Sequence, residues 1–525
     1  MIYRLAQFAF ALFICSCPLS ACAAERLAAI FADNMVLQRD SPVPVWGWAE
    51  KGQNITVSFG GQEKSTTAGE AGRWMVKLDP MPADKTPREL TVRGASSLVV
   101  RNVLVGDVWI CAGQSNMSWF LQDTLNAKAE MAAANYPTLR FLKVGQGGNP
   151  VPLDDLASRA PWAVCSPVTD RMFISAVGFY FARELLKEID VPIGLLGINY
   201  GGTCIETWIP LEGFRSVPEL KELCQSVDSR YHDYFLQMKG WLPRAEASLS
   251  SQQKLPDFPA SLWVSGDFQQ PTKCFNAMVN PCIPYSIRGV IWYQGEGNGG
   301  EGETYFHKMR ALTMGWRQLW NQGQPLTGEG RDFPFYSVQL ANFQKSDPNK
   351  PEGGDTWTRL REAQQQSLSI PNTGMAVAID IGEAESIHPQ NKQDVGKRLA
   401  LWALAKDYGK QVVYSGPLYK GYKVEGNRIR LEFDHVGGGL IVGEKKGIGP
   451  ATVLPDGKLK WFAIADKDRK WYWADAVIDG NTILVSHPQV PVPSAVRYAF
   501  AFNPEGANLY NKEGLPASPF RTDNW

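Results

Sequence analysis

The chain has 525 residues, which is enough for two to four domains with a sizeable core. Hydrophobic residues make up 44% and charged residues 20%, as in ordinary globular proteins, and basic and acidic residues are equal in number at 53 each. This balance excludes the charge excess that is typical of proteins binding nucleic acids or anionic membranes, so no nucleic-acid partner is expected.

The first 24 residues have the pattern of an export signal. Arg4 precedes an apolar run, residues 5–14, that is too short to span a bilayer. Ala21-Cys22-Ala23 fits a small-residue cleavage site, whereas residues 19–22 also match the bacterial lipoprotein box, in which Cys22 carries lipid. The sequence therefore predicts an exported bacterial protein that is periplasmic, secreted or anchored to the outer membrane through Cys22, with no other membrane insertion.

Three parts follow this signal. Short alternating runs between Gly, Asn, Asp and Pro turns predict a small β-sandwich over residues 25–100. From 101 to 410, apolar strands alternate with helical patterns, which predicts an α/β domain with a parallel sheet covered on both faces. Residues 411–525 return to β patterns and predict a second β-module, which could pack against the first. The expected helices of the middle domain are residues 175–189, 304–320, 358–368 and 390–409.

Six cysteines lie beyond the signal: Cys111, Cys165, Cys204, Cys224, Cys274 and Cys282. An even number in an oxidising compartment is compatible with disulfides, and Cys224 with either Cys274 or Cys282 could staple an insertion. No CxxC pair or histidine cluster has the spacing of metal ligands, so neither a metal nor another cofactor is expected.

The stretch at residues 103–120 is the most informative for function. A β-branched apolar run ends in Cys111-Ala112-Gly113 and places Ser115 on a Gly-Gln-Ser-Asn-Met turn. In open α/β sheets, chemistry lies just outside the carboxyl ends of the strands. A serine hydroxyl there is a candidate nucleophile, but it is weak and needs a neighbouring base.

Three other strand-like runs of the middle domain also end in polar turns. They lead into Gly201-Gly202, into Gln294-Gly295-Glu296-Gly297-Asn298, and into a loop that ends at His388-Pro389. Because parallel strands have their carboxyl ends at one edge of the sheet, these turns are expected to converge on Ser115.

Each turn has the chemistry that an acyl-transfer site needs. His388 is the one of five histidines on this edge and is the candidate base. Gly201 and Gly202 allow close approach of backbone N–H groups to a substrate, and the side-chain amide of Gln294 or Asn298 could add an oxyanion donor. Glu296 is expected to be a buried carboxylate that holds its loop rather than a direct participant.

Four motifs in order resemble the sialate O-acetylesterase family. They are GQSNM at 113–117, GGTCIETW at 201–208, WYQGEGN at 292–298 and IHPQNKQDVGKRLAL at 387–401. That family belongs to the SGNH-hydrolase superfamily and is similar to some acetylxylan esterases. The resemblance implies a flavodoxin-like three-layer catalytic domain flanked by β-modules. The α/β-hydrolase motif GxSxG is absent, because Met117 stands at its last position.

The resemblance also implies residue roles. Ser115 matches the nucleophile and His388 the general base. The oxyanion hole matches the backbone N–H groups of Ser115 and of the Gly201-Gly202 turn, with the Gln294 amide as its side-chain member and that of Asn298 as the alternative.

Two departures from the family pattern stand out. Gly297 replaces a more usual serine, and Glu385 occupies the position three residues before the histidine where the superfamily often has aspartate. Glu385 could orient His388, since glutamate serves in some triads. Asp380, Glu383 or a backbone carbonyl could do so instead.

The predicted activity is that of an exported carbohydrate O-acetylesterase that forms a serine acyl-enzyme, with an O-acetylated sialic acid as the first expected substrate. Acetylated xylan or another plant glycan is the alternative substrate, and a non-catalytic glycan-binding protein is the alternative class. Trp119 and Trp208 flank the motifs and could contact the acyl group or sugar, or belong to the core. Arg361 is a candidate for binding a sialate carboxylate, its alternative being a charge on a helix surface.

Overall fold

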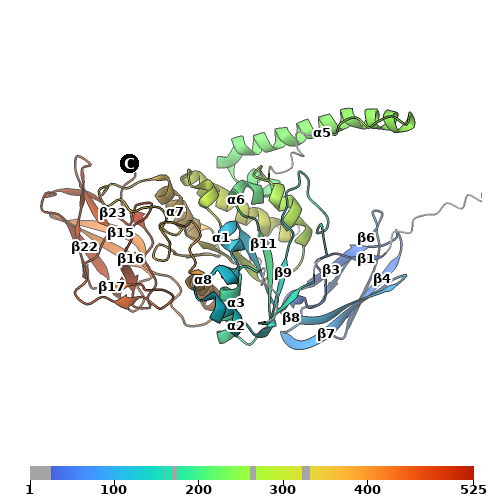
Figure 1. Ribbon diagram of the computed structural model, residues 1–525, viewed down its shortest axis with the longest axis horizontal. Helices are drawn as coiled ribbons and strands as arrows, with labels where there is room; N and C mark the ends of the chain where they lie inside the picture. Colours follow the sequence, from blue (N-terminus) through green and yellow to red (C-terminus); the bar gives the residue numbers. More distant parts are fainter. Residues whose placement is uncertain (1–24, 160, 168–173, 260–267, 322–331) are drawn as a thin grey trace, which may run out of the picture.

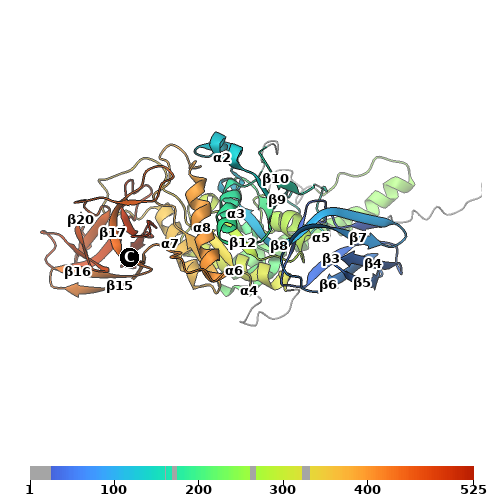
Figure 2. The ribbon, with the colours of Figure 1, turned by 90° about the horizontal axis from the view of Figure 1, so that it is seen from below.

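The structure, a computed structural model, describes residues 25–159, 161–167, 174–259, 268–321 and 332–525. Three parts lie in a row along its longest axis, with the amino-terminal β-module at one end and the carboxyl-terminal β-module at the other (Figure 1). The expectation that the two β-modules pack against each other is wrong, because the α/β domain lies between them in both views (Figure 2).

The strands of the amino-terminal module pair antiparallel, except that β2 pairs with β8 in parallel. Its strands are β1 (Arg26–Leu27), β2 (Val36–Gln38), β3 (Val43–Trp48), β4 (Asn54–Phe59), β5 (Gln62–Thr67), β6 (Arg73–Leu78), β7 (Asp84–Arg93) and β8 (Ser97–Gly113). Alternate residues of β4 are buried, as the sequence pattern predicts for a strand with one face toward a core. The long strand β8 pairs with β7 and then continues into the central sheet. The expected boundary at residue 100 therefore falls inside one continuous strand.

The central sheet holds six parallel strands and one antiparallel edge strand. Its order is β10-β9-β11-β8-β12-β13-β14. The strands after β8 are β9 (Tyr136–Lys143), β10 (Ala163–Cys165), β11 (Ile193–Asn199), β12 (Gly289–Tyr293), β13 (Phe335–Val338) and β14 (Thr373–Ala376). The chain adds strands first on one side of β8 and later on the other. Ser115, which follows β8, therefore lies at the topological switch point, where open α/β sheets bind ligands.

Helices cover both faces of this sheet. They are α1 (Ser115–Ser118), α2 (Ala127–Ala133), α3 (Ala176–Glu188), α4 (Leu211–Ser216), α5 (Lys221–Ser250), α6 (Glu303–Trp320), α7 (Thr356–Gln366) and α8 (Lys392–Lys406). Figure 2 shows α3 on one side of the sheet, and α4 and α6 on the other. The four helices expected from the sequence correspond to α3, α6, α7 and α8, and this doubly wound arrangement confirms the predicted fold class. The 30-residue α5 projects from the body (Figure 1).

Helix starts follow from local side chains. Ser175 caps α3 by accepting a hydrogen bond from the N–H of Gly178, and Asn391 caps α8 by accepting one from Asp394. The cap at Asn391 fixes where α8 begins, only three residues after His388. The loop that carries His388 is therefore anchored close to that residue by the start of α8.

The carboxyl-terminal module has a hydrophobic core of its own, which includes Ile429, Leu431, Ile464 and Val496. Its strands are β15 (Leu418–Glu425), β16 (Arg428–Asp434), β17 (Leu440–Glu444), β18 (Thr452–Val453), β19 (Phe462–Asp466), β20 (Trp471–Trp473), β21 (Asp475–Asp479), β22 (Thr482–Ser486), β23 (Pro493–Tyr498), β24 (Leu509–Asn511) and β25 (Phe520–Arg521). In contrast, the core of the amino-terminal module is continuous with that of the α/β domain.

The six cysteines after the signal are all free thiols, so the expected disulfide between Cys224 and either Cys274 or Cys282 is not formed. Cys224 instead places its thiol near the carboxylate of Asp228, one turn along α5. The predicted export signal, including Cys22, lies outside the described residues. Within the part of the chain that the structure describes, no helix has the length and apolar character needed to cross a bilayer.

Candidate active site

Ser115 opens the single turn of α1, directly after the carboxyl end of β8. The chain can reach this position only because Gly113 has no side chain. Its φ is +137°, and a Cβ there would come within 2.1 Å of the carbonyl oxygen of Tyr293 on β12. The N–H of Gln114 donates to that same carbonyl at 3.0 Å. These contacts fix the turn that presents the hydroxyl of Ser115.

His388 lies on the loop between β14 and α8 and contacts Ser115 directly. Its Nε2 is 2.7 Å from Ser115 Oγ, and its ring stacks on that of Trp119 with centroids 5.0 Å apart. Burial of the imidazole lowers the pKa of His388, and the charge of Lys392 lowers it further. Both effects favour the neutral ring, which is the form that can accept a proton from serine.

None of the expected acids hydrogen-bonds to His388. The side chain of Glu385 is exposed and makes no such bond, so the prediction that Glu385 orients the ring through a hydrogen bond is wrong. Glu383 accepts a bond from the N–H of Gln390, and Asp380 pairs with both terminal nitrogens of Arg398. The backbone of His388 is held instead by Ser386, whose Oγ accepts from its N–H and donates to its carbonyl oxygen.

The Gly201-Gly202 turn lies against Ser115, as expected. A Cβ on Gly201 would be 3.5 Å from that of Ser115, and Gly202 has a φ of +75°. The N–H of Tyr200 donates to Gly113, which ties this turn to the end of β8. Over the described ranges, no hydrogen bond uses the N–H of Ser115, Gly201 or Gly202. These three donors are thus free to stabilise a negative oxygen.

The amides of Gln294 and Asn298 are not free donors. Gln294 Nε2 donates to the carbonyl of Thr203 and to Asn298 Oδ1, and the side chain is fully buried. Asn298 Nδ2 donates to Glu206 and Glu301, two carboxylates that also bind the buried Lys308. The prediction that either amide donates to the oxyanion is therefore wrong. Both amides hold the turn that follows Gly202.

The three predicted substrate contacts have different outcomes. Trp119 is half-buried beside His388, so it lies at the site. Trp208 is fully buried, donates to Thr203 and packs edge-on against Trp292, which makes it a core residue. Arg361 is also fully buried, and the two alternatives for it, substrate contact and surface charge, are both wrong.

Arg361 instead joins two parts of the molecule. Its guanidinium donates to the carbonyl oxygens of Leu340 and Ala341 in the α/β domain and to those of Ala501 and Phe502 in the carboxyl-terminal module. Four of its five N–H donors are used in these bonds, and its full burial keeps it from a sugar carboxylate.

Two residues beside Ser115 and His388 were not predicted from the sequence, Asn116 and Lys392. Both are buried and bonded to each other, Lys392 Nζ donating to Asn116 Oδ1 at 2.5 Å. Asn116 Nδ2 also donates to Glu296, which agrees with the expected loop-holding role of that carboxylate. A lysine in the first turn of a predicted helix gives no sequence signal of this kind, because such lysines are mostly solvated.

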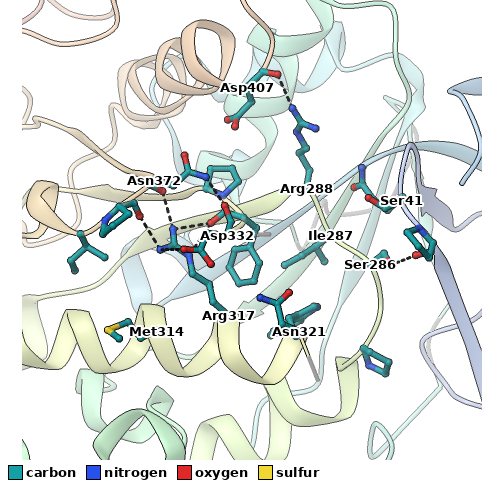
Figure 3. Close-up of a pocket in the computed structure, with 18 of the residues that line it drawn as sticks. Ser41, Ser286, Ile287, Arg288, Met314, Arg317, Asn321, Asp332, Asn372 and Asp407 are labelled. Carbon is teal, nitrogen blue, oxygen red and sulfur yellow. Dashed lines mark hydrogen bonds and ion pairs between the residues drawn. The ribbon is translucent and has the colours of Figure 1, made fainter. Parts of the chain in front are cut away.

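A cavity of about 1460 Å³, drawn in Figure 3, is lined by neither Ser115 nor His388. Among its lining residues, Arg288 directly precedes β12 and Asn372 directly precedes β14, so it lies at the amino ends of the strands, the edge opposite Ser115. Its most buried cation, Arg317, donates to the backbone carbonyls of Phe333, Pro371 and Asn372. No group of histidine, cysteine or acidic side chains suited to a metal ion occurs among the described residues.

A doubly wound domain with a serine and a histidine in contact at its catalytic edge is the arrangement of a serine carboxylic-ester hydrolase. Residues 261–405 match the family model described as carbohydrate esterase, sialic acid-specific acetylesterase. Human sialate O-acetylesterase is 28% identical over 94% of this chain and 92% of its own. The rat (Rattus norvegicus) sialate O-acetylesterase is 32% identical over 75% of this chain and 76% of its own.

A solved structure is similar along nearly the whole chain. It is a carbohydrate acetylesterase from Xanthomonas citri, 35% identical, with a TM-score of 0.77 over 96% of this chain and 100% of that one. The chain belongs to the sialate O-acetylesterase family. Its activity is the hydrolysis of acetyl esters on carbohydrates, as the sequence predicted.

Proposed function

We propose that Ser115 and His388 carry out this hydrolysis through an acetyl-enzyme. The observation that supports it is the 2.7 Å contact between Ser115 Oγ and His388 Nε2. Oγ bonds to the acetyl carbonyl carbon while its proton passes to Nε2, and the carbonyl becomes a tetrahedral oxyanion. When the ester C–O bond breaks, Nε2 returns the proton to the departing sugar oxygen.

The second half of the reaction repeats these roles with water. His388 takes a proton from the water molecule that attacks the acetyl carbon, and Ser115 leaves with that proton as acetate is released. The free N–H groups of Ser115, Gly201 and Gly202 are the proposed oxyanion donors in both steps. Removing one such donor costs about 10²–10³ in kcat in comparable sites.

The first proposed substrate is an O-acetylated sialic acid, and the alternative is acetylated xylan. The names of the human and rat relatives favour the sialic acid. The neighbour from Xanthomonas citri is named only as a carbohydrate acetylesterase and supports either. With Arg361 excluded as a carboxylate ligand, no residue of the site singles out a sialate.

Acetate release from the two substrates tests this choice. Purified protein is incubated with O-acetylated sialic acids and, separately, with acetylated xylan, and Ser115→Ala is carried through both. Faster acetate release from the sialic acid is expected, and release from xylan alone would reject the sialate assignment. Equal rates of p-nitrophenyl acetate hydrolysis by wild type and Ser115→Ala would instead reject Ser115 as the nucleophile.

We also propose that the protein is exported, on the basis of the signal pattern over residues 1–24. Mass spectrometry of the protein from its native host distinguishes the routes. A lipid-modified amino terminus at Cys22 is the lipoprotein outcome, and an unmodified terminus just after the small-residue site is the soluble one. Retention of residues 1–24 would reject both.

A further inference from the structure

A chain of buried polar groups lies beneath the catalytic pair. Asn116, the residue after Ser115, donates from Nδ2 to Glu296 Oε1 at 2.5 Å and to the carbonyl of Ile387 at 3.0 Å. Its Oδ1 accepts from Lys392 Nζ. Every hydrogen-bonding direction of this amide except one acceptor lone pair is therefore used, and the amide has a single orientation.

The same chain of groups holds both neighbours of His388. Asn116 binds the carbonyl of Ile387, and Lys392 Nζ donates to the carbonyl of Pro389 at 2.6 Å. The residue next to Ser115 and a residue at the start of α8 thus hold the backbone carbonyls of the residues on either side of the histidine. No carboxylate performs this task, since the acids near His388 are bonded elsewhere or exposed.

Lys392 brings a positive charge into this buried position. Its side chain is 0% exposed, and its Nζ is 5.5 Å from the ring centroids of both Trp119 and Tyr293. Trp119 in turn stacks on His388. The acidic groups that face the ammonium are Glu296, on the turn after β12, and Glu383, on the loop before His388.

We propose that Lys392 is a positioning residue of the reaction, which holds His388 against Ser115 through Asn116 and the carbonyl of Pro389 and which keeps the resting imidazole uncharged. The inference rests on the proposed roles of Ser115 and His388. The positive charge of Lys392 disfavours protonation of the imidazole, so the base stays available at a lower pH than an isolated histidine would.

The pKa values agree in direction with this geometry. Burial and the charge of Lys392 both lower the pKa of His388. Burial also lowers the pKa of Lys392 to about 7, against the opposing charges of Glu296 and Glu383. A base whose pKa is lowered loses activity only at more acidic pH.

The test compares Lys392→Met with Lys445→Met, each in the full chain. Lys445 is the control, because its side chain is also largely buried, at 6% exposed, and its ammonium pairs with Asp394 of α8, the helix that carries Lys392, but makes no contact with the site. For Lys392→Met, kcat on p-nitrophenyl acetate is expected to fall about tenfold or more with KM within about twofold. The acid limb of kcat/KM is expected to move up by roughly half a pH unit or more.

A merely structural lysine would not move that limb. The inference is supported if both variants lose the same thermal stability but only Lys392→Met shifts the acid limb of the pH profile. A wild-type pH profile and kcat in Lys392→Met would overturn it. If Ser115→Ala keeps the wild-type rate, the proposed function itself fails, whereas inactive Ser115→Ala beside a normal Lys392→Met rejects only this inference.

If Lys392→Met does not fold, the variant Asn116→Asp tests the positioning role instead. The carboxylate keeps the bond from Lys392 but cannot donate to Ile387 or Glu296. It also places a negative charge beside His388. A lower kcat with an acid limb moved to higher pH is expected, and an unchanged limb with unchanged kcat would refute the positioning role.

Discussion

Replacing Arg361 by methionine separates the structural account of this residue from the sequence-based one. Methionine fills most of the same space but donates no hydrogen bond. Four carbonyl oxygens, two in the α/β domain and two in the carboxyl-terminal module, would lose a hydrogen bond, and only that of Ala341 keeps another partner, Trp357 Nε1. All four bonds are 2.7–3.0 Å long, and the side chain is fully buried, so water cannot replace it without rearrangement.

The cost can be bounded from these contacts. A stranded buried carbonyl costs at least ~1 kcal/mol, which gives about 3 kcal/mol for the three that keep no other side-chain donor. For units of this size a loss of ~1 kcal/mol lowers Tm by about 2–4 °C, so a fall of about 10 °C is expected. Burial lowers the pKa of Arg361 to about 9, so the guanidinium is still charged at pH 7 and its loss is felt there.

Differential scanning calorimetry and steady-state kinetics at 25 °C measure the two consequences. The expected result is a lower Tm with KM for the acetylated sugar unchanged. The control is Arg310→Met, which removes a partly exposed arginine bonded to Glu219 and is expected to change Tm little. An unchanged Tm with a raised KM in Arg361→Met would refute the structural role and restore the substrate-binding one.

Further outcomes follow from the same contacts. The acid limb of kcat/KM is expected below pH 6.5, because a base with a lowered pKa stays neutral down to more acidic pH, and a limb above pH 7 would contradict the assignment to His388. Glu385→Gln should keep wild-type kcat/KM, and a large kinetic loss would contradict the exposed position of this acid. Asp380→Asn should lower Tm, because it breaks the buried ion pair with Arg398. Gly113→Ala should abolish activity, since its Cβ would overlap Tyr293, and an active, stable variant would contradict the fixed turn. Thiol titration after unfolding without reductant should find six thiols in the chain from residue 25, and four or fewer would show a disulfide.

The sequence was sufficient to predict the central sheet and the meeting of Ser115 with His388. Apolar runs that end in polar turns carry this information, because parallel strands must place their carboxyl ends at one edge. The boundary at residue 100 failed for a related reason. A strand that leaves one sheet and enters another shows no change of pattern, and β8 continues through that point.

Side-chain roles were predictable only where local pattern decides them. Nothing within α7 indicates that the carboxyl-terminal module covers Arg361, since that contact joins residues about 140 positions apart. Likewise, the sequence around Gln294 does not indicate that its amide is bonded to Thr203 and Asn298 in the folded protein. The proposed role of Lys392 depends on its hydrogen bond to Asn116, which lies 276 positions earlier in the chain. Spacing in the sequence cannot report such partners.

The most direct test of the account is the site of acetylation during turnover. The protein is mixed with p-nitrophenyl acetate, quenched in acid within the first turnovers, digested and analysed by mass spectrometry. An acetyl group on the hydroxyl of Ser115 is predicted, with His388→Ala failing to form it at a comparable rate. Continued acetate release with Ser115 unmodified, or with the acetyl group on another residue whose loss abolishes turnover, would contradict the account.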